Sequence, residues 1–531
     1  MRPFTLLVLS ALLVSTTFWA GPMGPCFFFG LAPLFLITQR CRPSEAFFKG
    51  WLFGTVAWAG GMYWLAGTVS RFLRVPAPVG AAVFLVICAG GGLMAAMPAG
   101  GVRWLAPPLE KALGGRPYLA FSLVFVPFLV AVEGYVPAIF PIRFANALQG
   151  HLPAVQSVEL FGAAGLAALI AGTNASVYVL FHSGFKRWGF AACMAALLAC
   201  NEGYGFLRIR QVDAQLAGLK PRALKVAILQ AAIPIWRKSD PASSRANLES
   251  HTALIDEALR RGPMDLIIWP ETTYGRDLGY REAWGEPLAP SISGEPFSVQ
   301  LSKDVPQRAQ MLMSALARSV DPATGRRKVY NVAFLRGSGH EFLGLACKRF
   351  RMPFGEFMPL GGVFPAFYRW SPRTRRITPG EEQRLLTTQQ GIRLGVLICY
   401  EDMNAEYARR YAAAGADILV NMTNDAWFGR SQAPEQHLRY ACLRAVENRR
   451  FLLRAVNTGI SAVVDPVGRV RSRLPGGARG VLIDEAIPLQ GRTPGSRLGR
   501  WPYRLALLLL FVLAWPALLR GGSLAPRAET C

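Results

Sequence analysis

The sequence has little acidic charge for its length. It contains 33 Asp and Glu residues against 58 Lys and Arg residues in 531 positions, so its formal net charge at pH 7 is +25. The basic residues are scattered, and no RNA- or DNA-binding motif accompanies them, so we expect no nucleic-acid partner. A basic domain beside anionic lipid headgroups is the simpler account of this charge.

The chain also lacks the cysteine pattern of a disulfide-bonded scaffold. Its nine cysteines are odd in number, and most of them lie in or beside long apolar runs, so we expect no disulfide framework. We interpret Cys347 and Cys442 as structural. A prenylation box is excluded because the last cysteine, Cys531, is the final residue of the chain.

Long apolar runs, by contrast, are abundant, and 52% of the residues are hydrophobic. Several runs approach the roughly 20 residues that a helix needs to cross a bilayer. The pattern predicts a helical membrane bundle with eight spans, seven before residue 207 and one near the end of the chain. The predicted spans are residues 4–20, 24–39, 48–69, 79–101, 118–140, 157–181, 188–206 and 501–519.

The first run has some features of a signal peptide, with Arg2 ahead of it and Ala20 behind it. Phe18 stands where a cleavage site needs a small residue, which favours an uncleaved span. With the N-terminus in the cytoplasm, the inner loops hold more Lys and Arg than the outer loops, as the positive-inside rule requires. Seven crossings then place residues 207–500 outside the membrane, and the eighth span (501–520) returns a tail, residues 521–531, to the cytoplasm.

Residues 207–500 alternate between strand-like and helix-like patterns, which indicates an α/β fold with sheets covered by helices. A Gly- and Pro-rich stretch, residues 285–306, is expected to form a loop. Strands are predicted at 226–233, 266–269, 391–398, 417–421, 451–456 and 461–464, and helices at 245–261, 405–414 and 434–448.

Three chemically reactive side chains lie beside strand-like runs in this region. Cys399 stands where an apolar run stops and polar residues begin, so its thiol can be presented on a turn with one face open to substrate. Glu271 ends another apolar run, and Lys348 precedes a second carboxylate, Glu356, by eight positions. Glutamate, lysine and cysteine together supply the base, the oxyanion stabiliser and the nucleophile for acyl transfer through a thioester.

The sequence around these side chains resembles one family. The segments WPET (269–272), KRFRMPFGEF (348–357), ICYE (398–401) and NDAWFG (424–429) are similar to the nitrilase-type domain of the apolipoprotein N-acyltransferases. The resemblance runs from about residue 225 to residue 484, and the apolar sequence on both sides is similar to that family's layout. It implies a multi-span α-helical membrane bundle (1–206) joined to a nitrilase-like αββα sandwich.

The resemblance also implies roles for the three reactive side chains. Cys399 would attack an acyl ester of a phospholipid, Glu271 would accept the thiol proton, and Lys348 would stabilise the tetrahedral oxyanion. The acyl group would then pass from the cysteine thioester to the α-amine of the diacylglyceryl-cysteine at the N-terminus of an apolipoprotein. This transfer completes lipoprotein maturation.

Further positions are similar to that family's supporting and substrate-binding residues. We expect Glu356 to orient Lys348 or the amine, Tyr400 and Glu401 to shape the pocket, and Trp427 and Phe354 to contact substrate. No cofactor and no metal are expected. The expected partners are a phospholipid donor, a diacylated apolipoprotein acceptor and membrane lipids. We expect the chain to act as a monomer in the bacterial cytoplasmic (inner) membrane, with its catalytic domain facing the periplasm.

Two departures from the family pattern keep other functions open. Where the family often has Gln-Gly-Asn-x-x-Gln, residues 230–235 read Gln-Ala-Ala-Ile-Pro-Ile, and the tyrosine usual two positions before the lysine is Ala346. A diverged acyltransferase acting on another amine, a membrane-tethered amidase or nitrilase, and a catalytically silent partner therefore stay as alternatives. Within the fifth run, Glu133 is costly in a bilayer unless it faces the interior of the bundle.

Overall fold

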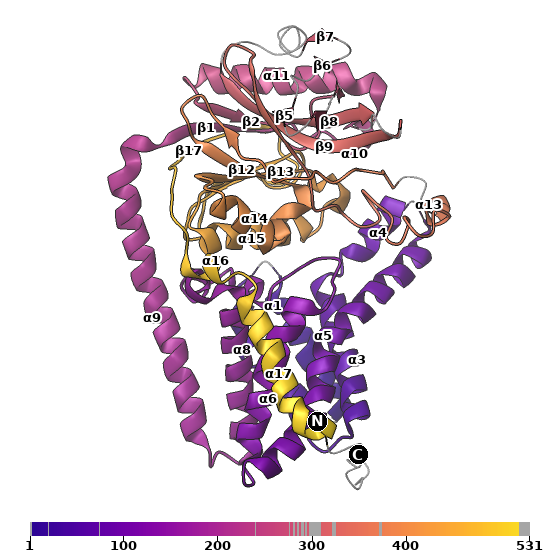
Figure 1. The fold of residues 1–531 in the computed structure, drawn as a ribbon, viewed down its shortest axis with the longest axis vertical. Coiled ribbons are helices and arrows are strands. Elements are labelled where there is room, and N and C mark those ends of the chain that lie inside the picture. Colours follow the sequence, from indigo (N-terminus) through magenta and orange to yellow (C-terminus); the bar gives the residue numbers. More distant parts are fainter. Residues whose placement is uncertain are drawn as a thin grey trace. The chain divides into compact units, whose positions relative to one another are not determined.

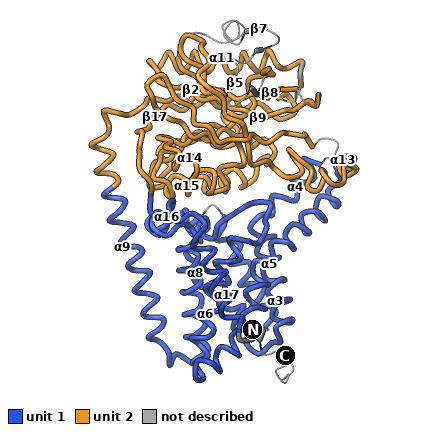
Figure 2. Tube along the Cα trace, in the orientation of Figure 1, with its two compact units in different colours: residues 1–211, 493–531 blue, residues 212–492 orange. Residues whose placement is uncertain are grey.

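The computed structural model places most of the chain in two compact units, coloured separately in Figure 2. One unit is Met1–Gln211 with Thr493–Cys531, and the other is Val212–Arg492. The predicted tail (521–531) and most of the predicted loop (285–306) lie outside the residues that the structure describes. Those residues are 3–19, 21–73, 75–238, 240–275, 277–279, 282–283, 286–287, 291–292, 295–296, 309–320, 325–370 and 374–519.

The first unit is built from helices, as the apolar runs predict (Figure 1). In the described part of the chain, four helices are long and apolar enough to cross a membrane: α5, α6, α8 and α9. Shorter apolar helices are α1, the stretch that includes α2, and α17, so the number of eight spans stays a prediction. The helices are α1 (Pro3–Thr17), η1 (Gly24–Phe28), α2 (Ala32–Thr38), α3 (Pro43–Gly61), α4 (Leu65–Leu73), α5 (Ala77–Ala112), α6 (Pro117–Tyr135), η2 (Phe144–Leu148), α7 (Leu152–Val155), α8 (Val158–His182), α9 (Trp188–Leu219), α16 (Pro494–Leu498) and α17 (Trp501–Leu519).

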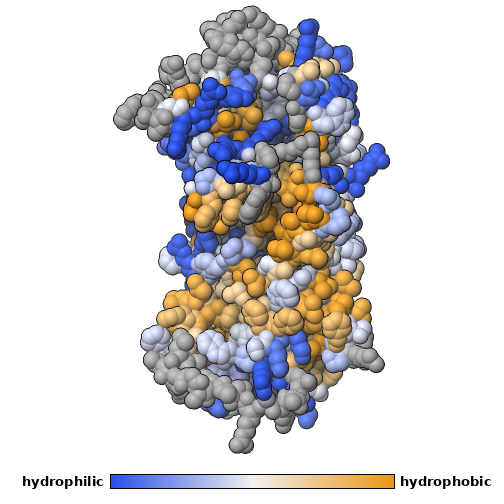
Figure 3. All heavy atoms as spheres, turned by 90° about the vertical axis from the view of Figure 1, so that its right-hand side faces the viewer, coloured by the Kyte–Doolittle hydropathy of each residue, from blue (hydrophilic) through white to orange (hydrophobic). Residues whose placement is uncertain are grey.

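Helices α3 and α5 pack closely through small residues. A Cβ atom on Gly54 would lie 2.7 Å from the main-chain oxygen of Gly92, so only glycine permits this approach. Small residues at helix contacts are typical of membrane bundles. Large apolar side chains such as Val86 and Phe511 are exposed, and Figure 3 shows hydrophobic side chains over much of one face. Such a surface is suited to a lipid environment.

Glu133 lies in the interior of the helical unit, where it is 4% exposed. Its carboxylate accepts a hydrogen bond of 2.8 Å from the hydroxyl of Tyr503 in α17 and another from the backbone N–H of Phe144 in η2. The Arg143 side chain donates to the main-chain oxygen of Glu133. The Tyr503 hydroxyl and the Phe144 N–H satisfy the carboxylate that the sequence placed inside an apolar run, and the Tyr503 bond connects α6 to α17.

The second unit contains two main sheets, whose strands are shown as arrows in Figure 1. In the first sheet, β1, β2 and β8 are parallel, β17 pairs antiparallel with β1, and β9 and β10 continue antiparallel from β8. The longer strands are β1 (Leu224–Gln230), β2 (Leu266–Ile268), β8 (Gln310–Val320), β9 (Arg327–Arg336), β10 (Phe342–Cys347) and β17 (Gly480–Ala486), and the short ones are β3 (Leu278–Gly279), β6 (Ser291–Ile292) and β7 (Glu295–Pro296). A separate short pair is β4 (Glu282–Ala283) and β5 (Glu286–Pro287).

The second main sheet has the order β11-β12-β13-β14-β15-β16, with β12, β13 and β14 parallel. Its strands are β11 (Leu386–Thr387), β12 (Arg393–Ile398), β13 (Ile418–Thr423), β14 (Leu452–Val456), β15 (Ala462–Val464) and β16 (Val470–Arg473). The helices of this unit are α10 (Ile235–Lys238), α11 (Ser244–Arg260), α13 (Phe367–Trp370), α14 (Ala405–Ala413) and α15 (Ala433–Asn448), with the 3-10 turns η3 (Lys220–Arg222), η4 (Pro241–Ser243), η5 (Cys399–Met403) and η6 (Asp425–Phe428).

Successive side chains of a strand belong to different hydrophobic cores, which shows that the two sheets lie face to face between helical layers. In β1, Val226 belongs to the core between the sheets and Ala227 to the core beneath α11. In β12, Val396 joins the core between the sheets and Leu397 joins the core beneath α14 and α15. Because strand side chains alternate between faces, both strands are apolar on both sides. The layers form the predicted αββα sandwich.

Several predicted elements end at different residues from those observed; the run predicted at 79–101, for example, lies in α5, which continues to Ala112. The strand predicted to reach residue 233 stops at Gln230, because the chain turns at Ala232, whose φ is +53°. The helix predicted to end near residue 206 continues to Leu219. Its last turns are polar, so an apolar run could not reveal its full length.

Candidate active site

Cys399 lies at the turn from β12 into η5. Its φ of +55° is in the left-handed region, which a residue with a Cβ atom adopts at an energetic cost. The side-chain amide of Asn421 in the adjacent strand β13 donates to the carbonyl oxygens of Leu397 and Cys399, at 3.1 and 3.0 Å. These bonds hold the strained turn that presents the thiol at the carboxyl end of its strand.

Glu271 follows β2 in the other sheet and is 7% exposed. The Asn331 side-chain amide donates to its Oε1 at 2.8 Å, and Lys238 Nζ donates to its main-chain oxygen at 2.6 Å. The next residue, Thr272, also has a positive φ, +46°, and its backbone N–H donates to Ser314 Oγ at 2.8 Å. Contacts from several elements therefore fix the position of this carboxylate.

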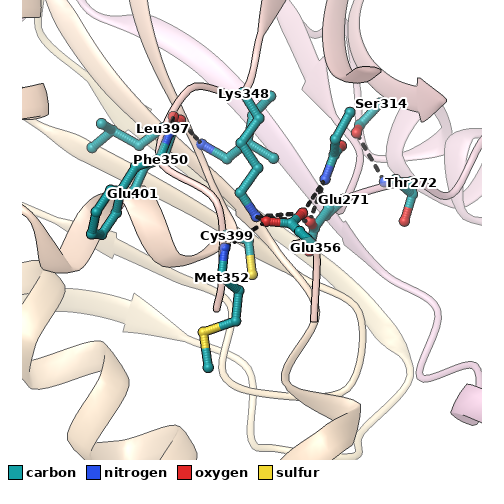
Figure 4. Close-up of polar contacts among 12 residues, drawn as sticks. Glu271, Thr272, Ser314, Lys348, Phe350, Met352, Glu356, Leu397, Cys399 and Glu401 are labelled. Carbon is teal, nitrogen blue, oxygen red and sulfur yellow. Dashed lines mark hydrogen bonds and ion pairs between the residues drawn. The ribbon is translucent and has the colours of Figure 1, made fainter. Parts of the chain in front are cut away.

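Lys348 follows β10, and its side chain is buried. Its ammonium lies 2.8 Å from the carboxylate of Glu356 and 3.8 Å from Oε1 of Glu271, as Figure 4 shows. Burial alone lowers the pKa of Lys348, but the thiolate form of Cys399 and the carboxylates of Glu356 and Glu271 raise it above its ordinary value. The structure thus gathers Glu271, Lys348, Glu356 and Cys399, all proposed from the sequence, into one cluster.

Glu401 connects the lysine segment to the nucleophile strand. Its Oε1 accepts hydrogen bonds from the backbone N–H groups of Arg349 and Phe350, at 2.7 and 2.9 Å, and its Oε2 accepts one from Ile398 at 2.9 Å. Burial raises the pKa of Glu401 to about 7, although these backbone bonds lower it. Tyr400 is also buried and stacks on the Phe350 ring, with 4.8 Å between ring centroids.

The thiol of Cys399 is protonated in the resting site. Burial and the negative charge of Glu271 together raise its pKa to about 12, although Lys348 acts in the opposite direction. A thiol in this state is a weak nucleophile until a base removes its proton. The nearby carboxylate of Glu271 can accept that proton, and the Lys348 ammonium can stabilise negative charge as it develops.

The two predicted substrate-contacting residues are partly exposed. Phe354 and Trp427 each have 39% of their surface exposed. Phe354 lies between Lys348 and Glu356 in sequence, and Trp427 lies in η6. In the described residues, no group of three or more His, Cys, Asp or Glu side chains is arranged to hold a metal ion.

Behind the nucleophile turn lies a buried charged network that the sequence analysis did not identify. His437 of α15 bridges two aspartates, with Nδ1 2.9 Å from Asp425 and Nε2 3.0 Å from Asp402. Arg454 of β14 contacts both carboxylates and the side-chain oxygen of Asn421. All five side chains are at most 6% exposed. The network therefore connects the Cys399 turn to the turn that carries Trp427.

His437 is held as a cation in this network. Burial and the charge of Arg454 lower its pKa, but Asp402 and Asp425 outweigh them and raise it to about 9. Sequence position gave one signal for the network, because Asp402 follows the cysteine motif and Asp425 belongs to the NDAWFG segment. His437 lies in the helix-like segment Gln436–Arg439 that follows NDAWFG and shares the family resemblance, whereas Arg454 carries no such signal.

Comparison with known proteins gives two family matches. Residues 10–176 match the apolipoprotein N-acyltransferase N-terminal domain, and residues 225–491 match the carbon-nitrogen hydrolase family. Two solved structures resemble the chain at low similarity. Nit3 of Saccharomyces cerevisiae, a nitrilase-superfamily member, is 18% identical with a TM-score of 0.36, covering 58% of this chain and 97% of its own. A carbon-nitrogen hydrolase from Helicobacter pylori is 17% identical with a TM-score of 0.35, covering 57% and 96%.

Curated relatives match nearly the whole chain. The apolipoprotein N-acyltransferase of Geobacter metallireducens is 30% identical over 512 residues, which cover 94% of this chain and 92% of that protein. The apolipoprotein N-acyltransferase of Azotobacter vinelandii is 29% identical over 506 residues, with the same coverage of 94% and 92%. The match includes both the apolar helices and the α/β unit. The chain therefore belongs to the apolipoprotein N-acyltransferase family of membrane proteins.

Proposed function

We propose that this protein transfers an acyl chain from a membrane phospholipid to the N-terminal diacylglyceryl-cysteine of apolipoproteins. The observation that carries the proposal is the cluster of Glu271, Lys348, Glu356 and Cys399, in which a protonated thiol, a carboxylate and an ammonium lie together in a buried site. The names of the full-length relatives support the choice of acceptor.

The first half-reaction acylates the enzyme. As the Cys399 sulfur bonds to the ester carbonyl carbon of the phospholipid, Glu271 takes the thiol proton. Lys348 stabilises the oxyanion of the tetrahedral intermediate, and Glu356 holds the ammonium from 2.8 Å away. Collapse of the intermediate breaks the ester C–O bond, and the lysophospholipid leaves as an alcohol with the proton from Glu271. The acyl chain is now a thioester.

The second half-reaction transfers the acyl group to nitrogen. The free α-amine of the acceptor bonds to the thioester carbonyl carbon, and Glu271 removes a proton from that nitrogen. Collapse expels the Cys399 sulfur, which regains a proton from Glu271, and an amide remains on the acceptor. Phe354 and Trp427 supply exposed aromatic surface for the acyl chains. The excess of basic residues in the predicted inner loops supports a location in the inner membrane, with the catalytic unit facing the periplasm.

Intact mass spectrometry tests this proposal with three proteins: wild type, Cys399→Ser and the matched control Cys347→Ser. Cys347 is a half-buried cysteine of the same unit that forms no disulfide with any described residue. Each protein is incubated with phospholipid, then with a diacylated lipopeptide that has a free amine. We expect an acyl adduct on wild type and Cys347→Ser but not on Cys399→Ser, with release by hydroxylamine and transfer to the peptide.

Each other outcome has a definite meaning. An adduct that passes to water, but not to the peptide, would replace the proposed acceptor and favour the hydrolase alternative. An adduct on Cys399→Ser would exclude Cys399 as the nucleophile. No adduct on wild type, under conditions that acylate a known family member, would overturn the phospholipid donor.

A further inference from the structure

One buried guanidinium contacts the supports of two turns at the candidate active site. Arg454 lies in β14 and is paired in register with Asn421 in β13, which is itself paired with Leu397 in β12. The three residues therefore lie side by side across neighbouring parallel strands. The Arg454 side chain is fully buried, so its charge and its hydrogen-bond donors need partners inside the protein.

On one side, Arg454 supports the turn that carries Cys399. Its Nη1 donates to the side-chain oxygen of Asn421 and to Oδ2 of Asp402, each at 2.5 Å. Because the guanidinium engages the oxygen of the Asn421 amide, the NH₂ group of that amide faces the carbonyl oxygens of Leu397 and Cys399. Asp402 belongs to η5, which begins at Cys399. The guanidinium thus reaches the nucleophile turn by two routes.

On the other side, Arg454 supports the turn that carries Trp427. Its Nη2 donates to Oδ2 of Asp425 at 3.3 Å, and Asp425 begins η6. His437 Nδ1 lies 2.9 Å from the other carboxylate oxygen of Asp425. A Cβ atom on Gly459 would overlap Oδ2 of Asp425, so the space for this carboxylate depends on a glycine. The position of the Trp427 turn is therefore fixed at its first residue.

The shape of the guanidinium matters here as well as its charge. Two cations, Arg454 and His437, balance the two carboxylates of Asp402 and Asp425. A lysine in place of Arg454 would keep this balance. It has a single nitrogen, however, whereas the planar guanidinium directs separate nitrogens at the two turns. Substitution by lysine therefore removes the link between the turns and keeps the buried charge.

We propose that Arg454 is a positioning residue for acyl transfer, which holds the Cys399 turn and the Trp427 turn in one arrangement. This proposal rests on the function proposed above, in which Cys399 accepts the acyl group and Trp427 contacts the acyl chain. The Cys399 turn governs how fast sulfur attacks an ester. The Trp427 turn governs how strongly a long acyl chain is preferred over a short one. A change at Arg454 alters both properties together.

The test measures acylation of the full-length protein in detergent by two esters, p-nitrophenyl butyrate and p-nitrophenyl palmitate. Release of p-nitrophenolate gives the rate, and peptide mass spectrometry locates the acyl group on Cys399. The variant is Arg454→Lys, and the matched control is Arg450→Lys. Arg450 is also buried, but its guanidinium donates to main-chain oxygens, including those of Ala416 and Gly491, each at 2.7 Å.

We expect Arg454→Lys to lower kcat/KM for the butyrate about tenfold, the effect of losing a buried charge-assisted hydrogen bond at the Cys399 turn. The ratio of palmitate to butyrate kcat/KM should fall about fivefold besides, because the Trp427 turn loses its contact too. Arg450→Lys should leave this ratio unchanged. A loss of folded protein lowers both rates equally, so the ratio separates positioning from a purely structural role.

Two further variants each remove the contact at one turn. Asn421→Ala should slow both esters by the same factor, and adding it to Arg454→Lys should slow the butyrate no further, because residues that act through one contact are not additive. Asp425→Asn keeps the size of the side chain and should lower the ratio by more than it slows the butyrate. If Arg454→Lys does not accumulate, these variants decide alone. No effect of either would show that the contacts of Arg454 position nothing.

The remaining outcomes separate this proposal from the function on which it rests. Equal slowing of both esters by Arg454→Lys would show that Arg454 does not position the Trp427 turn. An equal fall of the ratio in Arg450→Lys would assign the effect to the loss of any buried arginine. Either result would overturn the proposal and leave the proposed function intact. Wild type that neither ester acylates at Cys399 would overturn the nucleophile, and the proposed function with it.

Discussion

Replacing His437 with glutamine tests whether a buried imidazolium balances the two aspartates behind the nucleophile. Both ring nitrogens lie within hydrogen-bond distance of a carboxylate, 2.9 Å from Asp425 and 3.0 Å from Asp402. A neutral imidazole can donate only one of these bonds, whereas the cation donates both. Glutamine has no charge, so among the described side chains the variant leaves Arg454 as the only cationic partner of the two buried carboxylates.

The size and the pH range of the effect follow from the His437 pKa. Its rise from 6.5 to about 9 on folding corresponds to about 3 kcal/mol of stabilisation. Because the folded-state pKa is the higher one, this stabilisation is fully present below about pH 6.5. It is lost as the pH rises through about 9. The variant lacks it throughout, so the stability difference between the two proteins should shrink by about 3 kcal/mol across this range.

Urea unfolding of the full chain in detergent measures this difference at pH 6.5 and pH 9. The loss of β-sheet circular dichroism reports on the α/β unit, which holds every strand of the described chain. The control is His251→Gln. His251 is buried against Trp269, and burial lowers its pKa to about 4, so it is neutral throughout this range. A stability difference for His437→Gln that stays as constant with pH as that of His251→Gln would refute the reasoning.

Three further predictions concern other buried contacts. Glu356→Gln removes the negative charge 2.8 Å from Lys348, and this removal lowers the pKa of that lysine. The variant should slow Cys399 acylation on the order of 100-fold, and an unchanged single-turnover rate would contradict this. Asn421→Ala removes the donor to the strained turn at Cys399 and should reduce kcat about tenfold with KM for the acceptor unchanged, as steady-state kinetics can determine. Tyr503→Phe leaves the Glu133 carboxylate with one donor fewer and should destabilise the helical unit by about 1–3 kcal/mol; an equal melting temperature in detergent would contradict it.

Much of the fold was accessible from the sequence because hydrophobic patterns report burial directly. The predicted helix at 245–261 corresponds to α11 (Ser244–Arg260), and the predicted strand at 391–398 contains β12 (Arg393–Ile398). Strand pairing was not accessible. The sequence analysis did not predict β8 and β9, and their antiparallel pairing next to β2 depends on contacts between distant segments.

The sequence by itself determined the nature of the chemistry. Apolar length indicated the membrane helices, and the ends of strand-like runs presented Glu271, Lys348 and Cys399 within recognisable motifs. The side-chain types fixed which groups can act as base, oxyanion stabiliser and nucleophile, because those properties belong to each residue wherever it lies.

Only the tertiary structure decided how these groups are supported. Asp402 and His437 are 35 positions apart, and Arg349 and Glu401 are 52 apart, yet each pair is in hydrogen-bond contact. The same is true of Lys238 and the main chain of Glu271. A charge has little effect on a distant group in water, but burial removes the screening and makes proximity decisive. Which charges become neighbours is set by the packing of the sheets and helices, and no local pattern in the sequence records it.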